Sequence, residues 1–198
     1  VNFYVVDYGS EQLRRYVTLP QVGGMVFLGE DEKFNNLLKL IREEIKYRKQ
    51  LFIDYGGEYL NYLKNSGKKL PLKVIIFNNY DSIYEAYQNL YDDLPELVRD
   101  SSRYGIVYIF TANAVNSIST KIAQNFTNIY AYKLKDVSDY MSVFGVRAKS
   151  SPRDFSGRGY LNNGALHEFQ TSNIVKKELL CRKLIFSLWT YNVCRTFR

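Results

Sequence analysis

The chain has 198 residues, with 27 lysines and arginines against 20 aspartates and glutamates, and a formal charge of +7. Its 46% hydrophobic content is enough for a globular core and excludes intrinsic disorder as the main state. No run approaches the ~18 apolar residues that a membrane-spanning helix needs, and the first residues do not have the layout of a signal peptide.

The positive charge is concentrated near the C-terminus. Residues 176–198 carry a net charge of +5, whereas residues 1–175 carry only +2. A nucleic-acid binder that works by charge shows a basic face on the domain itself, because phosphate neutralisation supplies most of the non-specific affinity. We therefore expect no nucleic-acid partner. Cys181, Cys194 and His167 are too few for a disulfide framework or a zinc site.

Apolar runs that alternate with helical patterns predict the order of the elements. Strands are predicted at residues 1–8, 71–77, 105–110 and 128–134. Helices are predicted at residues 31–49, 58–65, 82–102 and 115–124, with Pro95 starting a new helix within the third. A turn at Asn163 and Gly164 predicts a hairpin over residues 160–166. The paired carboxylates at 43–44 and 92–93 are expected on solvated helix faces.

This order predicts an α/β fold with a mostly parallel sheet flanked by helices. Ligands of such sheets gather at the carboxyl ends of the strands, where the sequence places Asp7, Asn78, Asp81, Thr111 and Asn113. The pattern suits an NTPase that reaches Mg²⁺ and phosphate from neighbouring strands. It equally suits plain turn chemistry, which favours Asn and Asp at strand ends. No complete phosphate-loop motif is present in the chain.

Seven segments in register carry a family resemblance that covers residues 1–170. They are residues 3–9, 19–23, 31–49, 74–81, 103–112, 136–145 and 157–170. Together they resemble the FtsK/SpoIIIE ATPases, and more closely the C-terminal ATPase domain of the EssC, YukB and EccC proteins of type VII secretion. The resemblance implies a RecA-like P-loop NTPase core whose phosphate-binding loop lies upstream of Val1, so that this chain would be a piece of a longer protein.

The resemblance also implies that residues 74–81 are the Walker B segment, and here the sequence departs from the family. Asn78 takes the place of the acid that holds Mg²⁺, and Asn79 takes the place of the catalytic acid. An amide carries no charge and is no base, so we expect weak or no ATP hydrolysis although ATP and Mg²⁺ are the family's cofactors. Asp81 could compensate for the missing acids.

Four further residues are candidates for weak nucleotide contacts. Thr111 resembles the family's sensor position, and Asn113 follows it at the same strand end. A strand-end hydroxyl that satisfies the backbone explains Thr111 equally well. Arg147 and Arg158 could reach a nucleotide in a neighbouring subunit, or they could neutralise surface acids.

In the family that the chain resembles, the terminal domains have similarly weakened ATPase sites and are associated with binding secreted WXG-type proteins. The resemblance therefore implies a receptor and regulatory domain, on the cytoplasmic side of a membrane-anchored motor of Gram-positive bacteria, that contacts other ATPase domains in a hexamer. A DNA-translocating motor and a nucleotide-free scaffold are the alternatives. Residues 171–198 form a basic and apolar tail, which either meets a partner or the membrane surface or has no function.

Overall fold

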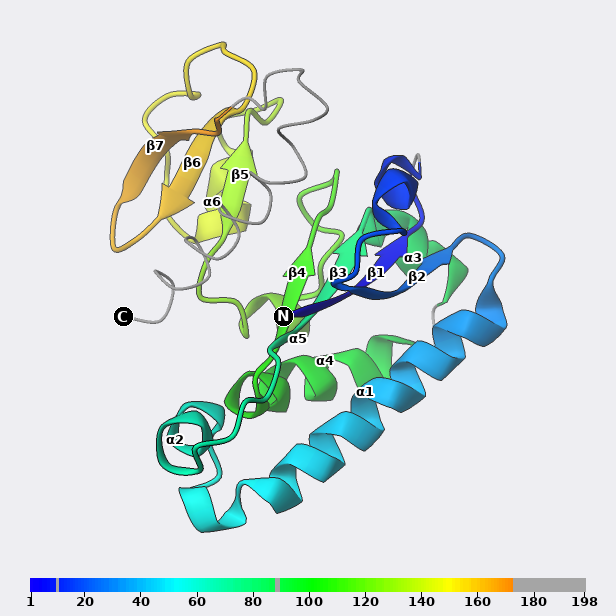
Figure 1. Ribbon diagram of the computed structural model, residues 1–198. Coiled ribbons are helices and arrows are strands. Elements are labelled where there is room, and N and C mark those ends of the chain that lie inside the picture. The colour runs from blue at the N-terminus through cyan, green and yellow to red at the C-terminus, as the bar shows by residue number, and fades with distance from the viewer. Residues whose placement is uncertain (10, 88–89, 173–198) are drawn as a thin grey trace. The chain divides into compact units, whose positions relative to one another are not determined.

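The computed structural model describes residues 1–9, 11–87 and 90–172, which fall into two compact units (Figure 1). The first unit is Val1–Thr127, and the second begins at Asn128. The predicted tail lies outside the described residues from position 173 onward.

The first unit contains four strands and most of the helices. Its elements are β1 (Asn2–Asp7), η1 (Gln12–Tyr16), β2 (Val22–Phe27), α1 (Asp31–Leu51), η2 (Ile53–Tyr55), α2 (Tyr59–Asn65), β3 (Lys73–Asn78), α3 (Tyr80–Ala86), α4 (Leu90–Ser101), η3 (Ser102–Tyr104), β4 (Ile106–Phe110) and α5 (Thr120–Ala123). The strands form one parallel sheet in the order β2-β1-β3-β4. The predicted α/β class, with a parallel sheet flanked by helices, is therefore confirmed.

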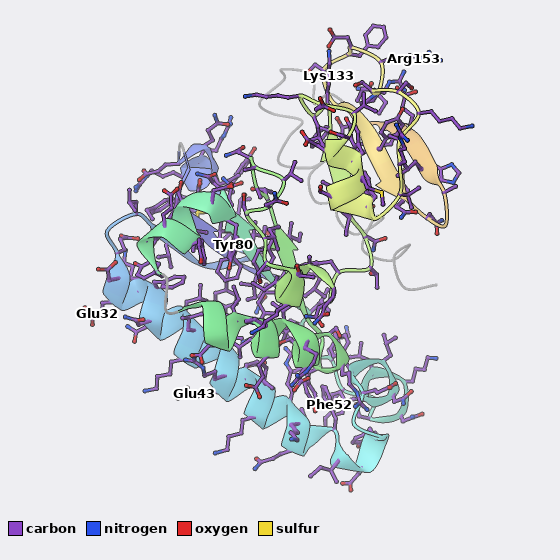
Figure 2. The ribbon with its side chains drawn as sticks, turned by 180° about the vertical axis from the view of Figure 1, so that it is seen from behind. Glu32, Glu43, Phe52, Tyr80, Lys133 and Arg153 are labelled. Atoms are coloured by element: carbon purple, nitrogen blue, oxygen red, sulfur yellow. The ribbon has the colours of Figure 1, made fainter. Side chains whose placement is uncertain are left out.

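The strands of this sheet are apolar on both faces, as parallel strands require when each face is covered. On β1, Val6 belongs to a core that the helices cover, and its neighbour Val5 belongs to a smaller cluster on the opposite face, beside the short η1 turn. Helix α1 contributes one stripe to the helical core, at the spacing expected for an amphipathic helix: Phe34, Leu37, Leu38 and Ile41. Figure 2 shows Glu32 and Glu43 on the outer side of the same helix.

The C-terminal half of α1 is fixed by a buried arginine. The Arg48 side chain is fully buried, and its guanidinium donates to Glu44 Oε1 (2.7 Å) and to the carbonyl oxygens of Pro71 (2.7 Å), Tyr104 (2.8 Å) and Gly105 (3.2 Å). Glu44 also pairs with Lys73 at 2.8 Å. Glu44 is therefore a structural ion-pair partner and not the solvated carboxylate that the sequence predicted, whereas Glu43 is exposed as expected.

The second unit is a small antiparallel sheet with one helix. Its elements are β5 (Tyr130–Tyr132), α6 (Asp139–Phe144), β6 (Arg158–Asn162) and β7 (Leu166–Gln170). The strand order is β5-β6-β7, and a tight connection after Asn162 joins the last two strands, which confirms the predicted hairpin. Its core contains Ala131 from β5 and the stacked rings of Tyr140 and Phe144 from α6.

The structure corrects details of three predicted elements. The strand predicted at 128–134 is β5, and it pairs with β6 in the antiparallel sheet because its buried Ala131 lies between two exposed tyrosines, the pattern of a strand covered on one face. Pro95 lies inside α4, whose apolar stripe packs into the core. The helix predicted at 115–124 is only the four-residue α5, because residues 113–117 form a loop anchored to Asp81.

Candidate functional site

The carboxyl ends of three neighbouring strands bring a group of polar side chains together. Asp7 is the last residue of β1, Asn78 is the last residue of β3, and Thr111 directly follows β4. The parallel register places Asp7 opposite Asn78, and Phe77 opposite the residue before Thr111. The three side chains therefore stand in a row across the end of the sheet, as the sequence predicts for strand-end residues.

A continuous hydrogen-bonded chain runs along this row. Asn78 Nδ2 donates to Asp7 Oδ1 at 2.8 Å, and Thr111 Oγ1 donates to Asn78 Oδ1 at 2.8 Å. The backbone N–H of Asn79 donates in turn to Thr111 Oγ1 at 2.9 Å. The Asn78 amide thus donates to Asp7 through its nitrogen and accepts from Thr111 through its oxygen. A carboxylate has no hydrogen to donate, so it could not make both contacts.

Asp7 is a fully buried carboxylate with neutral partners. Besides the Asn78 amide, it accepts the backbone N–H groups of Gly9 and Leu13, each at 3.2 Å. These three donors satisfy both oxygens of the Asp7 side chain with hydrogen bonds. Asp7 therefore holds the turn after β1 in place as well as the amide of Asn78.

Asn79 has a left-handed backbone, with φ = 59°, which Asn tolerates better than most residues. Its Nδ2 donates to Ser82 Oγ at 2.7 Å, and its Oδ1 accepts from Asn113 Nδ2 at 2.6 Å. Asn79 thus links the start of α3 to the loop after β4. An amide does not titrate near neutral pH, so the side chain of Asn79 makes these contacts without acting as an acid or a base.

Asp81 anchors the loop that follows β4. It accepts the backbone N–H groups of Asn113 (2.7 Å) and Ala114 (3.3 Å) and the hydroxyl of Ser117. Partial burial opposes ionisation, but these hydrogen bonds outweigh it and lower the pKa of the Asp81 carboxyl. Both oxygens of the Asp81 carboxylate accept hydrogen bonds from residues 113–117, so this side chain holds the loop after β4.

The hydrogen bonds of this group compete with a Mg²⁺ ion for its oxygens. Mg²⁺ requires oxygen ligands in near-ideal octahedral geometry, usually with one or two carboxylates among them. Asn78 Oδ1 is occupied by Thr111, and the oxygens of Asp7 and Asp81 are occupied by protein donors. Among the described residues, no group of three or more His, Cys, Asp or Glu side chains could hold a metal ion.

The two candidate arginines lie in the second unit. Arg147 is exposed in the segment after α6. Arg158, at the start of β6, is half-buried, and its Nε lies 3.6 Å from Glu168 Oε1 on β7. This ion pair agrees with neutralisation of a surface acid, one of the two roles considered for Arg158.

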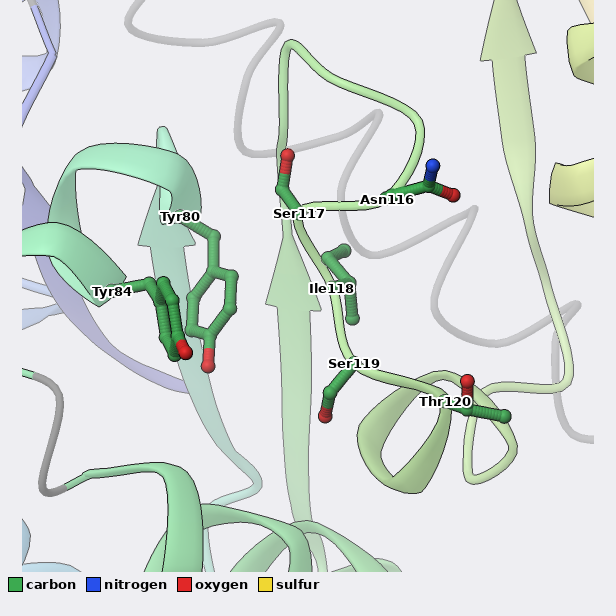
Figure 3. Close-up of a pocket in the computed structure, with 7 residues that line it drawn as sticks. All are labelled: Tyr80, Tyr84, Asn116, Ser117, Ile118, Ser119 and Thr120. Carbon is green, nitrogen blue, oxygen red and sulfur yellow. The ribbon is translucent and has the colours of Figure 1, made fainter.

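A pocket in the first unit was not predicted from the sequence. It has a volume of about 460 Å³ and is lined by residues of α3 and of the segment leading into α5: Tyr80, Tyr84, Asn116, Ser117, Ile118, Ser119 and Thr120 (Figure 3). The amide and hydroxyl side chains among residues 116–120 are the available signal, but the sequence predicts this segment as part of a helix. Ser117 joins this pocket to the strand-end group through its bond to Asp81.

No family model matches the chain. YukB of Bacillus subtilis is 26% identical over 168 residues, which cover 84% of this chain and 11% of YukB. The structure of EssC ATPases 2 and 3 from Geobacillus thermodenitrificans superposes with a TM-score of 0.79 at 23% identity, over 89% of this chain and 34% of that one. The homologues of this chain are type VII secretion ATPases of the EssC, YukB and EccC kind.

This resemblance agrees with the family expected from the sequence motifs. A further structural relative is Thermomonospora curvata EccC, ATPases 2 and 3, which was solved in complex with a signal sequence peptide. It superposes with a TM-score of 0.69 at 18% identity, over 89% of this chain and 33% of that one. The chain spans about a tenth of the length of the curated type VII secretion relatives that it matches, at 10% and 11% of the first two.

Proposed function

We propose that the chain is a degenerate C-terminal ATPase domain of a type VII secretion motor, which recognises WXG-type secreted proteins and regulates their export. The homology to EssC and EccC ATPase domains supports a place in the secretion motor. In this proposal the domain binds Mg-ATP weakly or not at all, and the other ATPase domains of a hexameric motor supply the hydrolysis.

One observation carries this proposal. The amide of Asn78 is held on both sides, by Asp7 and by Thr111, at the position where the family has its Mg²⁺-binding acid. Because the same contacts stabilise three strand ends, the site has a structural use that does not depend on nucleotide. Thr111 and Asn113 have their described hydrogen bonds within this group, so we assign them the same structural role.

The peptide complex of Thermomonospora curvata EccC supports the receptor part of the proposal. In this proposal a domain of that fold, with amides in place of the Walker B acids, keeps a surface for a secreted protein. No helix among the described residues is long and apolar enough to cross a membrane. We place the domain on the cytoplasmic side of a membrane-anchored protein, as in the family that it resembles.

Fluorescence anisotropy tests the receptor role. The probe is a labelled C-terminal peptide of a WXG-type protein from the same genome, titrated with the full-length protein, and a scrambled peptide of the same composition is the control. We expect saturable binding of the native peptide that does not require Mg-ATP. Equal affinity for the scrambled peptide would reject the receptor role.

A further inference from the structure

The antiparallel sheet of the second unit has apolar side chains on both of its faces. On one face, Ala131 and Tyr160 belong to the core with α6, where the ring of Tyr160 meets the ring of Tyr140. Successive side chains of a strand point to opposite faces, so Tyr130 and Tyr132 lie on the other face. An antiparallel sheet that meets water on one side carries polar residues there, so this second face has the composition of a covered one.

Three rings form a continuous cluster on this second face. The ring centroid of Phe169 on β7 lies 5.5 Å from that of Tyr130 and 5.7 Å from that of Tyr132, and both pairs meet edge to face. Gly159, on the middle strand β6, pairs with both Tyr132 and Phe169. A Cβ atom at Gly159 would lie 2.9 Å from the Phe169 ring, so this ring lies directly over the glycine. We call Tyr130, Tyr132 and Phe169 the aromatic face.

The aromatic face is exposed but small. Tyr130 is 58% exposed and Tyr132 is 53% exposed. Because an aromatic side chain buries about 150–250 Å², these exposed fractions of the two tyrosines amount to roughly 170–280 Å². A stable interface between two proteins needs about 800 Å² from each partner. The aromatic face is therefore too small to hold a second copy of the chain by itself, and its size suits a short segment.

The chain itself supplies such a segment. Residues 173–198 lie outside the described residues and begin three positions after Gln170, the last residue of β7. Leu179 follows Phe169 by ten positions, and an extended chain of that length spans about 33 Å. Three neighbouring strands are only about 10 Å across, so residues from 179 onward can reach every ring of the aromatic face. Large apolar residues are concentrated just there: Leu179, Leu180, Leu184, Ile185, Phe186, Leu188 and Trp189.

Charge does not attract this segment to the second unit. Residues 173–198 carry a net charge of +5, and residues 128–172 have six basic against four acidic side chains, a net charge of +2. Since the two net charges have the same sign, apolar contact has to hold the segment in place. Salt screens the repulsion between the charges, so a contact of this kind is not weakened by added salt.

We propose that residues 179–189 dock on the aromatic face and cover Tyr130, Tyr132 and Phe169 with their large apolar side chains. A segment joined to β7 by a short connection reaches the face at a high effective concentration, so it binds there in preference to a free ligand. The inference does not rest on the proposed receptor function, because it concerns a contact within one unit of the chain.

The fluorescence of Trp189 tests this contact directly. Trp189 is the only tryptophan in the sequence, so its emission reports on this segment alone. The measurement is quenching by acrylamide, together with the emission maximum, in the 198-residue chain. We expect a blue-shifted Trp189 that is protected from acrylamide, with a protection that does not depend on protein concentration and is not reduced by salt. A Trp189 as accessible as in the urea-unfolded chain would overturn the proposal.

Exchange of the two exposed tyrosines tests where the segment docks. Tyr130→Ser combined with Tyr132→Ser removes two rings, so the ratio of docked to free segment should fall about 10-fold or more and acrylamide should quench Trp189 more strongly. Tyr130→Phe combined with Tyr132→Phe keeps the rings and should keep Trp189 protected. Tyr47→Ser is the matched control, because Tyr47 is 54% exposed and lies on α1 in the first unit.

The other outcomes would overturn the proposal. Equal protection of Trp189 in wild type and in the double serine variant would mean that the segment docks elsewhere. Protection that is lost on dilution would assign the cover to a second copy, and protection that is lost in salt would assign it to ion pairs. Circular dichroism checks that the double serine variant stays folded. If it unfolds, the single exchanges Tyr130→Ser and Tyr132→Ser replace it, each with a smaller expected rise in quenching.

Discussion

Asn78 joins the ends of neighbouring strands through a single side chain. Its amide bridges Asp7 on one strand and Thr111 on another, and this bridge requires both a donor and an acceptor in one side chain. An aspartate at position 78 would place a second carboxylate beside Asp7, where the Asn78 amide now lies 2.8 Å from Asp7 Oδ1. Two carboxylates at that distance repel each other, so an acid at position 78 is poorly compatible with Asp7 in this chain.

The first prediction is that Asn78→Asp destabilises the protein. Because the new carboxylate repels Asp7 and replaces a hydrogen bond, we expect the free energy of unfolding to fall by about 2–3 kcal/mol at neutral pH. Urea unfolding followed by circular dichroism measures the change.

The matched control is the reciprocal exchange, Asp7→Asn with Asn78→Asp, which restores one amide and one acid to the pair. The double variant should recover part of the lost stability. An Asn78→Asp protein as stable as wild type would show that the contact with Asp7 is not maintained in solution.

The second prediction concerns Asp81 and pH. Hydrogen bonds in the folded state lower the pKa of this carboxyl, so its contribution to stability is present above the unfolded-state pKa, near 4, and is lost as pH falls through the lower folded-state value. Asp81→Asn should therefore be less stable than wild type at pH 7, by about 1–2 kcal/mol, and the difference should shrink on acidification.

Thermal unfolding of both proteins across this pH range measures that difference. Glu43→Gln on α1 is the control, since Glu43 is exposed and lies outside the strand-end group. A difference between Asp81→Asn and wild type that stays constant from pH 7 to the acid limit would contradict the anchoring role of the charged form.

Much of the strand-end group could be predicted from the sequence, because parallel strands bring their carboxyl ends to one edge. Asp7, Asn78, Asp81, Thr111 and Asn113 were all expected there, and all take part in the hydrogen-bonded group. The sequence did not reveal the individual contacts, since an Asn at a strand end has the same pattern whether it faces solvent, a metal ion or another strand. These contacts depend on the register between strands that are distant in sequence.

At the scale of elements, the two halves of the long helix α1 are held by different kinds of contact. Its first half packs through aliphatic and aromatic side chains, and its second half is tied to the loops before β3 and β4 through Arg48. Apolar spacing predicted the helix over residues 31–49, and the structure extends it to Leu51. The spacing gave no sign that an arginine near the basic end would be fully buried.

The third prediction is that Arg48→Met is strongly destabilising. The substitution leaves three carbonyl oxygens and Glu44 without their buried donor, so we expect a loss of about 3–5 kcal/mol in the free energy of unfolding. Denaturant unfolding measures it.

Arg42→Met is the matched control on the same helix. Arg42 pairs with Asp93 where both side chains are about half exposed, at 46% and 61%, and such pairs contribute only about 0–1 kcal/mol. Equal losses for Arg42→Met and Arg48→Met would contradict the role assigned to the buried guanidinium.

Two of the errors in element prediction share one physical cause. A run such as residues 128–134 shows that a strand forms, but its choice of sheet depends on partners elsewhere in the chain. The same holds for the helix predicted at residues 115–124, because Asp81 on another element holds the chain just before it through the backbone N–H groups of Asn113 and Ala114. β2 was not predicted as a strand, since its two glycines weaken the strand signal.

At the scale of the whole molecule, the net charge of +7 does not describe the part of the chain that the structure defines. Residues 1–175 carry only +2, and the excess lies in residues 176–198. The α/β unit is therefore nearly neutral, and the polar side chains at its strand ends are hydrogen-bonded to one another. Both features agree with the proposed protein-binding domain of a secretion motor. A motor that grips nucleic acid would need a stronger basic face.

The effect of Asn78→Ala on nucleotide use by the full-length protein tests the central claim most directly. The measurement is Mg²⁺-dependent ATP binding by calorimetry, together with the rate of ATP hydrolysis, in wild type and variant. We propose that Asn78 holds strand ends and not a metal ion, so we predict unchanged ATP stoichiometry, affinity and hydrolysis rate, with a modest loss of stability. The disappearance of one Mg²⁺-dependent ATP site in the variant would contradict the account.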